Sequence, residues 1–268
     1  MLTFDQLLAG IVIPLDKPRQ WSSFQAVSKA KAAVRSLYDI KKFKIGHAGT
    51  LDPLATGLLL ICVGKATKQI ETLQQDDKVY TGTMALGATT PCFDLERPID
   101  AYRPAAHITR MHVEDAAVRL TGEIDQIPPI FSAVKIDGQR AYQIGRETAE
   151  PQSLPAAKRV TVYEFQITDF RAGSPSFTPP AVEETSRMPQ TNLYNNPLGT
   201  VPEGLPQADF RIRCGKGTYI RSLARDLGEM LGCGAFLASL RREQVGTFDL
   251  SSACSVDNIR QYLEDLTM

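Results

Sequence analysis

The sequence contains few of the residues from which metal sites and disulfide frameworks are built. Its 268 residues include only five cysteines and three histidines. The cysteines are odd in number, far apart and never arranged as a C-x-x-C pair, which excludes a disulfide framework and a zinc site. His47, His107 and His112 are too far from the cysteines in sequence to complete a metal site with them. We therefore expect no metal, and a reducing, cytoplasmic compartment.

Long hydrophobic runs are also absent from the sequence. The longest uninterrupted apolar stretch covers residues 58–63, far below the roughly 20 residues that span a bilayer. Near the N-terminus, Asp5 stands where a signal peptide carries positive charge, and Gly10 and Pro14 interrupt the apolar residues. We expect a soluble protein with no signal peptide and no membrane partner.

The chain carries no net charge, because 30 Lys and Arg residues balance 30 Asp and Glu residues. A neutral chain is not a generic polyanion binder, but the charge is unevenly distributed. Residues 17–68 hold ten basic and two acidic side chains, and residues 211–242 hold seven basic and two acidic ones. If these two basic blocks meet in the folded protein, they form one phosphate-binding face. Ordinary fluctuation of charge along the chain is the alternative.

Strand and helix patterns alternate along the chain. Residues 79–86 and 159–170 are rich in β-forming residues and alternate in polarity, the second with one slip of register, which predicts two strands. Apolar spacing predicts helices over residues 105–120 and 219–231. This alternation of long strands with helices favours an α+β fold.

A further helix is predicted directly after a strand-like opening segment, residues 10–18. Ser22 or Ser23 can serve as its N-cap. Its outer face is expected to be basic. The side chains that recur at helical spacing are Phe24, Val27, Lys31, Val34 and Leu37.

Residues 172–207 differ from the rest of the chain. They are rich in Pro, Ser, Thr and Asn, lack periodicity, and separate the predicted strand 159–170 from another over residues 208–214. A loop of this length is usually functional or mobile, and a surface insertion without a catalytic role is the alternative. We expect a single domain over residues 1–268 with this insertion inside it.

Residues 46–57, GHAGTLDPLATG, contain three glycines, one proline and one carboxylate, so the backbone follows a tight path that presents Asp52. An aspartate before a proline is also a common helix cap. A carboxylate that acts as a nucleophile usually needs a cationic partner. The segment CGKGTYIRSLARDLG offers Arg221 and Arg225 on a predicted helix, although a solvated helix face is the alternative there.

Several segments, in order, resemble the signatures of the TruB family of pseudouridine synthases. They are GIVIPLDKPRQWSSFQAV, GHAGTLDPLATGLLLICVGKATK, KVYTGTMALGATTPCFD, PPIFSAVKIDGQRAYQIGR, CGKGTYIRSLARDLG and LRREQVGTF. The match covers most of residues 10–248. The resemblance implies a pseudouridine synthase fold, with a long, mostly antiparallel sheet flanked by helices and an active-site cleft across the sheet.

The resemblance also implies a reaction. It is the cofactor-independent isomerisation of uridine to pseudouridine in the T-loop of tRNA, at uridine 55. Asp52 matches the aspartate that attacks the nucleotide, either at the sugar or at the base, so that the uracil detaches, rotates and rejoins through C5. Tyr80 matches an aromatic residue that stacks on the uracil and is implicated in removing the C5 proton. Arg221 matches the residue that pairs with the aspartate.

Five further positions match residues that bind the substrate. His47 matches a residue that stabilises the T-loop when the base is extruded, and Asp94 matches one that contacts neighbouring elements of the site. Leu240 matches an apolar wall of the uracil pocket, while Lys17 and Lys68 match basic positions near the site. A buried histidine, a turn aspartate and a core leucine are the alternatives for the first three.

Two features depart from the family pattern. The glycine that often follows the aspartate at position 94 is absent, and only about twenty residues follow Phe248. Many bacterial members carry a PUA-type RNA-binding domain there, so we expect a short form that acts as a monomer and contacts the T-arm of tRNA through the catalytic domain and residues 172–207. The competing functions are an RNA-binding module without catalysis, disfavoured because Asp52, Tyr80 and Arg221 are present, and a dyskerin-type guide-RNA-dependent synthase, disfavoured because a PUA domain is lacking.

Overall fold

The computed structural model describes residues 2–40, 42–132, 134–136, 139–140, 155–180, 182 and 200–266. The chain divides into two compact units: unit 1 is Met1–Tyr80 with Leu240–Met268, and unit 2 is Thr81–Ser239. Both boundaries fall inside strands, one in β4 (Lys78–Leu86) and one in β12 (Ala235–Val245). Each of these two strands therefore contributes residues to both units.

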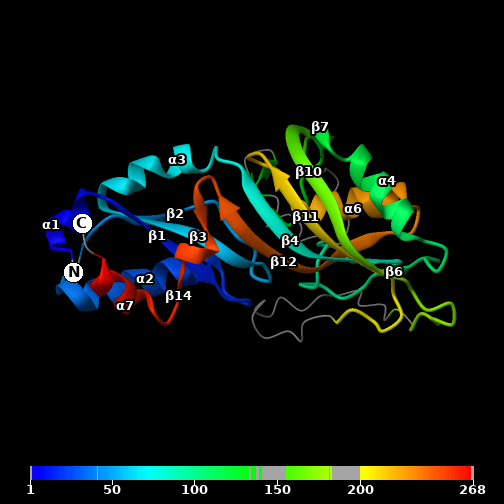
Figure 1. The fold of residues 1–268 in the computed structure, drawn as a ribbon, viewed down its shortest axis with the longest axis horizontal. Coiled ribbons are helices and arrows are strands. Elements are labelled where there is room, and N and C mark those ends of the chain that lie inside the picture. The colour runs from blue at the N-terminus through cyan, green and yellow to red at the C-terminus, as the bar shows by residue number, and fades with distance from the viewer. Residues whose placement is uncertain are drawn as a thin grey trace. The chain divides into compact units, whose positions relative to one another are not determined.

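Unit 1 holds a sheet with helices on its faces (Figure 1). Its strands are ordered β14-β1-β3-β12, with β2 paired to β3 and β13 paired to β12. The elements completed within it are α1 (Phe4–Ala9), β1 (Ile11–Lys17), α2 (Ser23–Tyr38), β2 (Ile45–Ala48), β3 (Thr56–Val63), η1 (Gly64–Gln69), α3 (Ile70–Leu73), β13 (Phe248–Asp249), η2 (Leu250–Ser252), β14 (Cys254–Ser255) and α7 (Ile259–Asp265).

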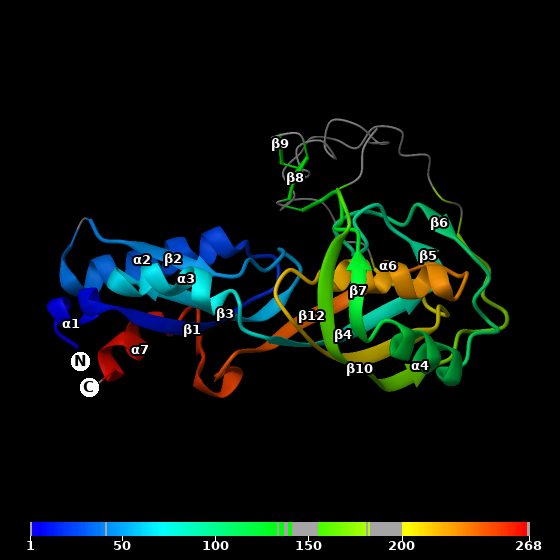
Figure 2. The same ribbon diagram turned by 90° about the horizontal axis from the view of Figure 1, so that it is seen from above.

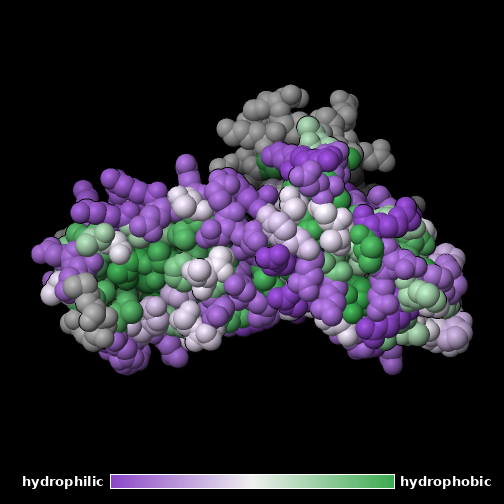
Figure 3. Space-filling model, turned by 45° about the horizontal axis from the view of Figure 1, so that its top comes forward, coloured by the Kyte–Doolittle hydropathy of each residue, from purple (hydrophilic) through white to green (hydrophobic). Residues whose placement is uncertain are grey.

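Strand β3 forms the centre of this part of the sheet. It pairs antiparallel with β1, from Ile11 opposite Val63 to Lys17 opposite Gly57, and parallel with β12 at Arg241 opposite Thr56. Every residue of β3 after Thr56 is buried, as expected for a continuous apolar run between two covered faces. Hydrophobic residues also gather on the visible surface of unit 1 (Figure 3).

The side chains that helix α2 buries differ from those predicted from helical spacing. Ser22 is the N-cap, and the residues that the helix buries are Ser23, Ala26, Ala30 and Val34. Phe24, which helical spacing placed on the apolar face, is 76% exposed. Val34 is buried as predicted, but the other buried side chains lie one residue before the predicted ones, which is about 100° around the helix.

The strands of unit 2 follow the order β12-β4-β11-β10-β7, and Figure 2 shows its helices α4 and α6 beside these strands. Its helix α4 packs against β10 and against α6. The elements completed within it are β5 (Ala88–Thr89), β6 (Ala101–Tyr102), α4 (Arg110–Arg119), β7 (Gly122–Gln126), β8 (Lys135–Ile136), β9 (Gln139–Arg140), β10 (Lys158–Arg171), β11 (Gln207–Cys214) and α6 (Ile220–Met230).

Most of the predicted elements are confirmed. The strands predicted over residues 79–86, 159–170 and 208–214 are β4, β10 and β11, and the helix predicted over residues 219–231 is α6. The predicted slip of register in β10 corresponds to irregularities in its pairing with β11. The prediction that α4 begins near residue 105 is wrong, because Thr109 forms a capping box with His112 and starts the helix at Arg110. The α+β class, with a large and mostly antiparallel sheet, is confirmed.

The five cysteines are free thiols and all are buried. Burial raises the pKa of Cys62 and Cys254 to about 11, so both thiols are protonated at neutral pH. Within the described ranges, no three His, Cys, Asp or Glu side chains gather as a metal site would require. Nor is any helix in that part of the chain long and apolar enough to cross a membrane.

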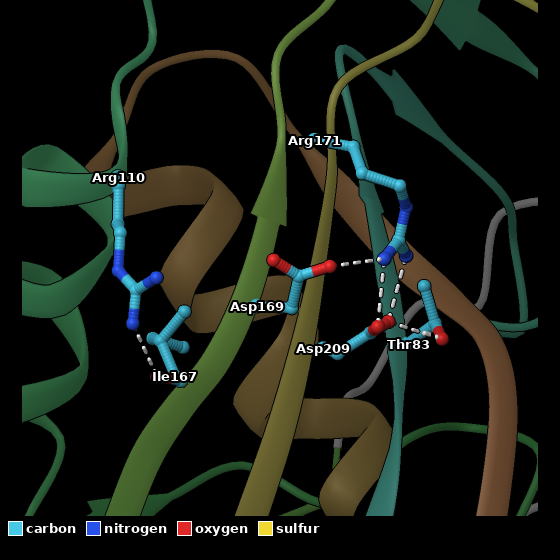
Figure 4. A network of polar contacts seen from close by, with 6 residues as sticks. All are labelled: Thr83, Arg110, Ile167, Asp169, Arg171 and Asp209. Atoms are coloured by element: carbon cyan, nitrogen blue, oxygen red, sulfur yellow. Dashed lines mark hydrogen bonds and ion pairs between the residues drawn. The ribbon is translucent and has the colours of Figure 1, made fainter.

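A polar network joins three strands of unit 2 at its surface (Figure 4). Arg171 of β10 donates from Nη1 and Nη2 to the two carboxylate oxygens of Asp209 on β11, both at 2.7 Å. Thr83 of β4 donates its hydroxyl to Oδ1 of Asp209, also at 2.7 Å. The hydrogen bonds from Arg171 and Thr83 lower the pKa of Asp209, although partial burial opposes them. Asp209 therefore links its own strand to the strands on both sides.

We expect Asp209→Asn to lower the free energy of unfolding by about 1 kcal/mol or less at pH 7, since the carboxylate is 32% exposed and Arg171 44% exposed. Because the folded-state pKa lies below the ordinary value of 3.8, the carboxylate stabilises the fold above about pH 4 and loses this effect as pH falls through the folded-state value. Urea unfolding at pH 7 and pH 3 measures the difference. Asp169→Asn is the control, and an equal loss in both variants at pH 7 would contradict the linking role of Asp209.

Candidate active site

Asp52 lies in the loop that connects β2 to β3, and its side chain is half-buried. The two strands pair antiparallel, from Ile45 opposite Val63 to Ala48 opposite Leu60, so the loop closes a hairpin. The carbonyl of Asp52 accepts a hydrogen bond from the amide of Ala55 at 3.1 Å, which tightens the turn after it. The predicted tight turn at Asp52 is thus seen in the structure.

Steric constraints explain why a glycine, Gly57, follows this loop. Gly57 has a φ of +98°, a conformation that side chains rarely adopt. A Cβ atom at this position would also lie 2.3 Å from the carbonyl oxygen of Arg242. Only glycine lets the loop enter β3 against the neighbouring strand β12.

Hydrogen bonds hold the residues on both sides of Asp52. Before it, the buried Ser23 hydroxyl donates to the carbonyl of Leu51 at 3.0 Å and accepts from the amide of Leu51 at 2.9 Å. After it, the carbonyl of Pro53 accepts from Lys17 Nζ at 3.3 Å and from the amide of Gln20 at 2.8 Å. The end of β1 and the start of α2 therefore fix the backbone from which Asp52 projects.

Lys17 is a buried cation at the aspartate loop. Its side chain is fully buried, and its ammonium donates to the carbonyls of Trp21 at 2.7 Å and Pro18 at 3.1 Å in addition to Pro53. A buried ammonium needs such acceptors, since desolvation without them would cost several kilocalories per mole. Lys17 therefore supports the backbone of the aspartate loop, and its part in substrate binding stays a prediction.

Arg242 is a second buried cation at this loop. Its Nε donates to the carbonyl of Leu58 at 2.7 Å, and its Nη2 donates to the carbonyl of Gly49 at 2.9 Å. Arg242 was not singled out from the sequence, and Ser23 was considered only as a possible N-cap. The signal that could have indicated them is that both lie inside segments that resemble the family. Each binds only backbone groups, and nothing in the sequence marks a residue with that role.

His47 lies in β2 and is half-buried. Burial lowers its pKa below the ordinary value of 6.5, and the charge of Arg242 lowers it further. Its Nδ1 is buried and has no hydrogen-bond partner in the described part of the chain. A protonated imidazole donates from both nitrogens, so this environment favours the neutral ring.

Three other predicted site residues lie in unit 1. Tyr80 is buried in β4, at the end of the unit. Leu240 is half-buried in β12, and its carbonyl accepts a hydrogen bond from the Thr56 hydroxyl at 3.4 Å. Lys68 is exposed on η1. Unit 1 therefore carries Asp52 together with five of the predicted residues.

Arg221 and Asp94 lie together in unit 2, and both side chains are buried. Nε of Arg221 is 3.7 Å from Oδ2 of Asp94. The guanidinium also donates to the carbonyls of Cys92 at 3.1 Å and Phe131 at 2.9 Å, while Oδ1 of Asp94 accepts from the amide of Glu96 at 2.9 Å. These contacts fix the arginine at the start of α6. The pairing of Arg221 with the aspartate at position 52 stays a prediction.

Most basic side chains of the second block have partners within the protein. Apart from Lys216, each of its basic side chains contacts an acidic side chain, an aromatic ring or a backbone carbonyl within its own unit. The contacts of those not yet described are Arg211 with Glu164, Arg213 over the Tyr163 ring, Arg225 with Asp226 and over the Phe93 ring, and Arg241 with Asp16. A single phosphate-binding face made from both blocks stays a prediction.

The ends of the predicted insertion line a hollow of about 420 Å³ in unit 2. The amide of Ser174 donates to the carbonyl of Gly204 at 2.9 Å, and the Phe177 ring lies 6.1 Å from the Tyr102 ring. None of the predicted site residues lines this hollow. Residues 181 and 183–199 lie outside the described residues, and the RNA-binding role predicted for the insertion stays a prediction.

We expect Ser23→Ala to lower the free energy of unfolding by about 1–3 kcal/mol, because the buried amide and carbonyl of Leu51 lose their partner. Chemical denaturation measures this change. Ser36→Ala, an exposed serine of the same helix, is the matched control and should change stability by less than about 0.5 kcal/mol. Equal effects in the two variants would contradict the contribution of the Ser23 hydrogen bonds.

We expect the imidazole of His47 to titrate below 6.5, the ordinary pKa, in the folded protein. Below that pH the unfolded chain binds a proton that the folded chain does not, so the neutral ring stabilises the fold above pH 6.5 and this effect is lost as pH falls. The NMR titration of its ring protons, assigned with His47→Gln, gives the midpoint. A midpoint at or above 6.5 would contradict the neutral, buried ring.

Comparison with known proteins identifies the family. Residues 35–220 match the model for the TruB family pseudouridylate synthase N-terminal domain, and residues 221–266 match that for the tRNA pseudouridylate synthase B C-terminal domain. The chain is 43% identical to the tRNA pseudouridine synthase B of Flavobacterium johnsoniae, over 98% of this chain and 100% of that protein. It is 42% identical to that of Phocaeicola vulgatus, over 95% of this chain and 94% of that protein.

Solved structures agree on the fold. A Cbf5-Nop10-Gar1 complex superposes with a TM-score of 0.60 at 24% identity, covering 97% of this chain and 57% of that one. An H/ACA RNP bound to a substrate RNA containing 2′-deoxyuridine gives a TM-score of 0.56 at 22% identity, with 97% and 56% covered. At these identities the likeness shows the fold alone, which is the predicted pseudouridine synthase fold. Because the family models match from residue 35 to residue 266, and relatives of similar length are more than 40% identical, this chain belongs to the TruB family of pseudouridylate synthases.

Proposed function

We propose that the protein isomerises uridine to pseudouridine in the T-loop of tRNA, at position 55, with Asp52 as the nucleophile. The observation that carries this proposal is the way the Asp52 loop is held. A nucleophile is effective when its position is fixed before the substrate arrives, and here Ser23 holds the residue before Asp52 while Lys17 holds the residue after it. Asp52 itself is only half-buried.

The proposed reaction needs no net oxidant, reductant or group donor, because substrate and product are isomers. Attack by the carboxylate of Asp52, either on C1′ of the ribose or on the uracil ring, lets the bond between C1′ and N1 break. The uracil then rotates and C5 bonds to C1′, the bond between Asp52 and the nucleotide breaks so that the carboxylate is regenerated, and the proton on C5 leaves while N1 gains one. Tyr80 is proposed to stack on the uracil and assist removal of the C5 proton, and Arg221 to orient the carboxylate.

RNA binding is proposed to rest mainly on unit 1. A uridine stacked in a loop must be extruded before its C5 and C1′ can react, at a cost of a few kilocalories per mole that stacking and phosphate contacts offset. The exposed basic side chains of the first block are suited to such contacts; they include Arg19, Lys42, Lys44, Lys65 and Lys68. We further propose that a monomer acts on the T-arm in the cytoplasm.

The test is incubation of the purified protein with an unmodified tRNA transcript and with a T-arm minihelix, followed by chemical mapping of pseudouridine. We expect product at position 55 in both RNAs. Asp52→Asn should lower the rate by more than about 1,000-fold, equivalent to about 4 kcal/mol of transition-state stabilisation.

Asp257→Asn is the control, because it removes a largely exposed carboxylate of the same unit and should leave the rate unchanged. Retained activity in Asp52→Asn would refute the assignment of the nucleophile. Product only at another uridine would refute the proposed position.

A further inference from the structure

Phe24 is the most exposed large apolar side chain among the described residues, with 76% of its surface accessible. It occupies the first turn of α2, whose buried face passes through Ser23 and Ala26 instead. A single exposed apolar residue is common in proteins and by itself indicates nothing. The position of Phe24 in the fold, close to Asp52, points to a function for this side chain.

Phe24 is held close to Asp52. Its neighbour Ser23 exchanges two hydrogen bonds with Leu51, and Leu51 directly precedes the aspartate. Successive Cα atoms lie about 3.8 Å apart, so this path separates the Cα atoms of Phe24 and Asp52 by at most about 15 Å. The ring therefore lies within reach of nucleotides next to one bound at Asp52.

Basic side chains share the helix face of Phe24. Residues 24, 28, 31 and 35 recur at the helical spacing i, i+4, i+7 and i+11, so they form one stripe along α2. Ser28, Lys31 and Arg35 of this stripe also line a surface hollow of about 570 Å³, whose lining includes Asp39 at the helix end. The stripe thus presents one aromatic ring, one hydroxyl and two cations over about 16 Å of helix.

We propose that this stripe of α2 binds the unpaired strand of the substrate RNA, with Phe24 stacked on a base beside the target uridine and with Lys31 and Arg35 on phosphates. The inference rests on the proposed function and identifies a binding surface for it. Unpaired bases stack on aromatic side chains, and cations track the backbone. Positive charge at residues 31 and 35 complements the phosphates, while the acidic Asp39 limits the contact at the far end.

The test compares Phe24→Ala with Phe24→Tyr in the Asp52→Asn background, where the T-arm minihelix binds without turnover. We expect Phe24→Ala to raise Kd about 10-fold, within the range for loss of one stacked base, and Phe24→Tyr to keep the original Kd. The control is Val118→Ala, which removes a side chain that is 70% exposed in unit 2 and should leave Kd unchanged.

With Asp52 restored, Phe24→Ala should raise KM about 10-fold and leave kcat unchanged, because the ring binds RNA without touching the reacting atoms. Thermal unfolding of Phe24→Ala should match that of the unsubstituted protein, since an exposed ring contributes little to the core. Kd unchanged in Phe24→Ala, or equally raised in Phe24→Ala and Phe24→Tyr, would overturn the stacking contact.

The two cations are tested separately. Lys31→Ala and Arg35→Ala should each weaken binding and reduce the slope of log Kd against log salt by about one, as expected for the loss of one phosphate contact. An unchanged slope in both variants would overturn the phosphate contacts. If the unsubstituted protein forms no pseudouridine in tRNA, the proposed function fails; if it forms product and all α2 variants bind normally, only this inference fails.

Discussion

The hydrogen bonds that hold the backbone around Asp52 are the interactions on which the candidate site depends. A loop packed against buried elements must satisfy its amide and carbonyl groups, and here side chains do so where no strand can pair. Ser23 satisfies Leu51, and Lys17 reaches Pro53. The same bonds join β1 and α2 to the loop, so the geometry of the carboxylate is tied to the core of unit 1.

The basic side chains of this chain serve two physical purposes, which cannot be distinguished from the composition alone. Lys17 and Arg242 are buried; they donate to backbone carbonyls and support the aspartate loop. Charges such as Lys68 stay at the surface, where they can attract phosphate. A buried cation costs desolvation energy unless acceptors surround it, and only the folded chain brings those acceptors together.

Helix α2 combines structural support with an exposed surface. Its inner face carries small residues such as Ala26 and Ala30, which allow close packing on the sheet and place Ser23 against the loop. Its outer face carries Phe24 and the basic residues. A larger side chain on the inner face would move the helix away from the sheet and lengthen the bonds that fix the loop. The packing of α2 on the sheet therefore also determines the position of Asp52.

Local patterns in the sequence determined most of the elements, including β4, β10, β11 and α6, because alternation and helical spacing report which residues a single element can bury. The glycine-rich segment around Asp52 likewise predicted a tight loop. Only the tertiary structure decided that Phe24 faces outward, that Lys17 is buried and that Arg221 lies beside Asp94. These outcomes depend on residues far apart in the chain, since burial and ion pairing are set by what packs around a side chain and not by its neighbours in sequence.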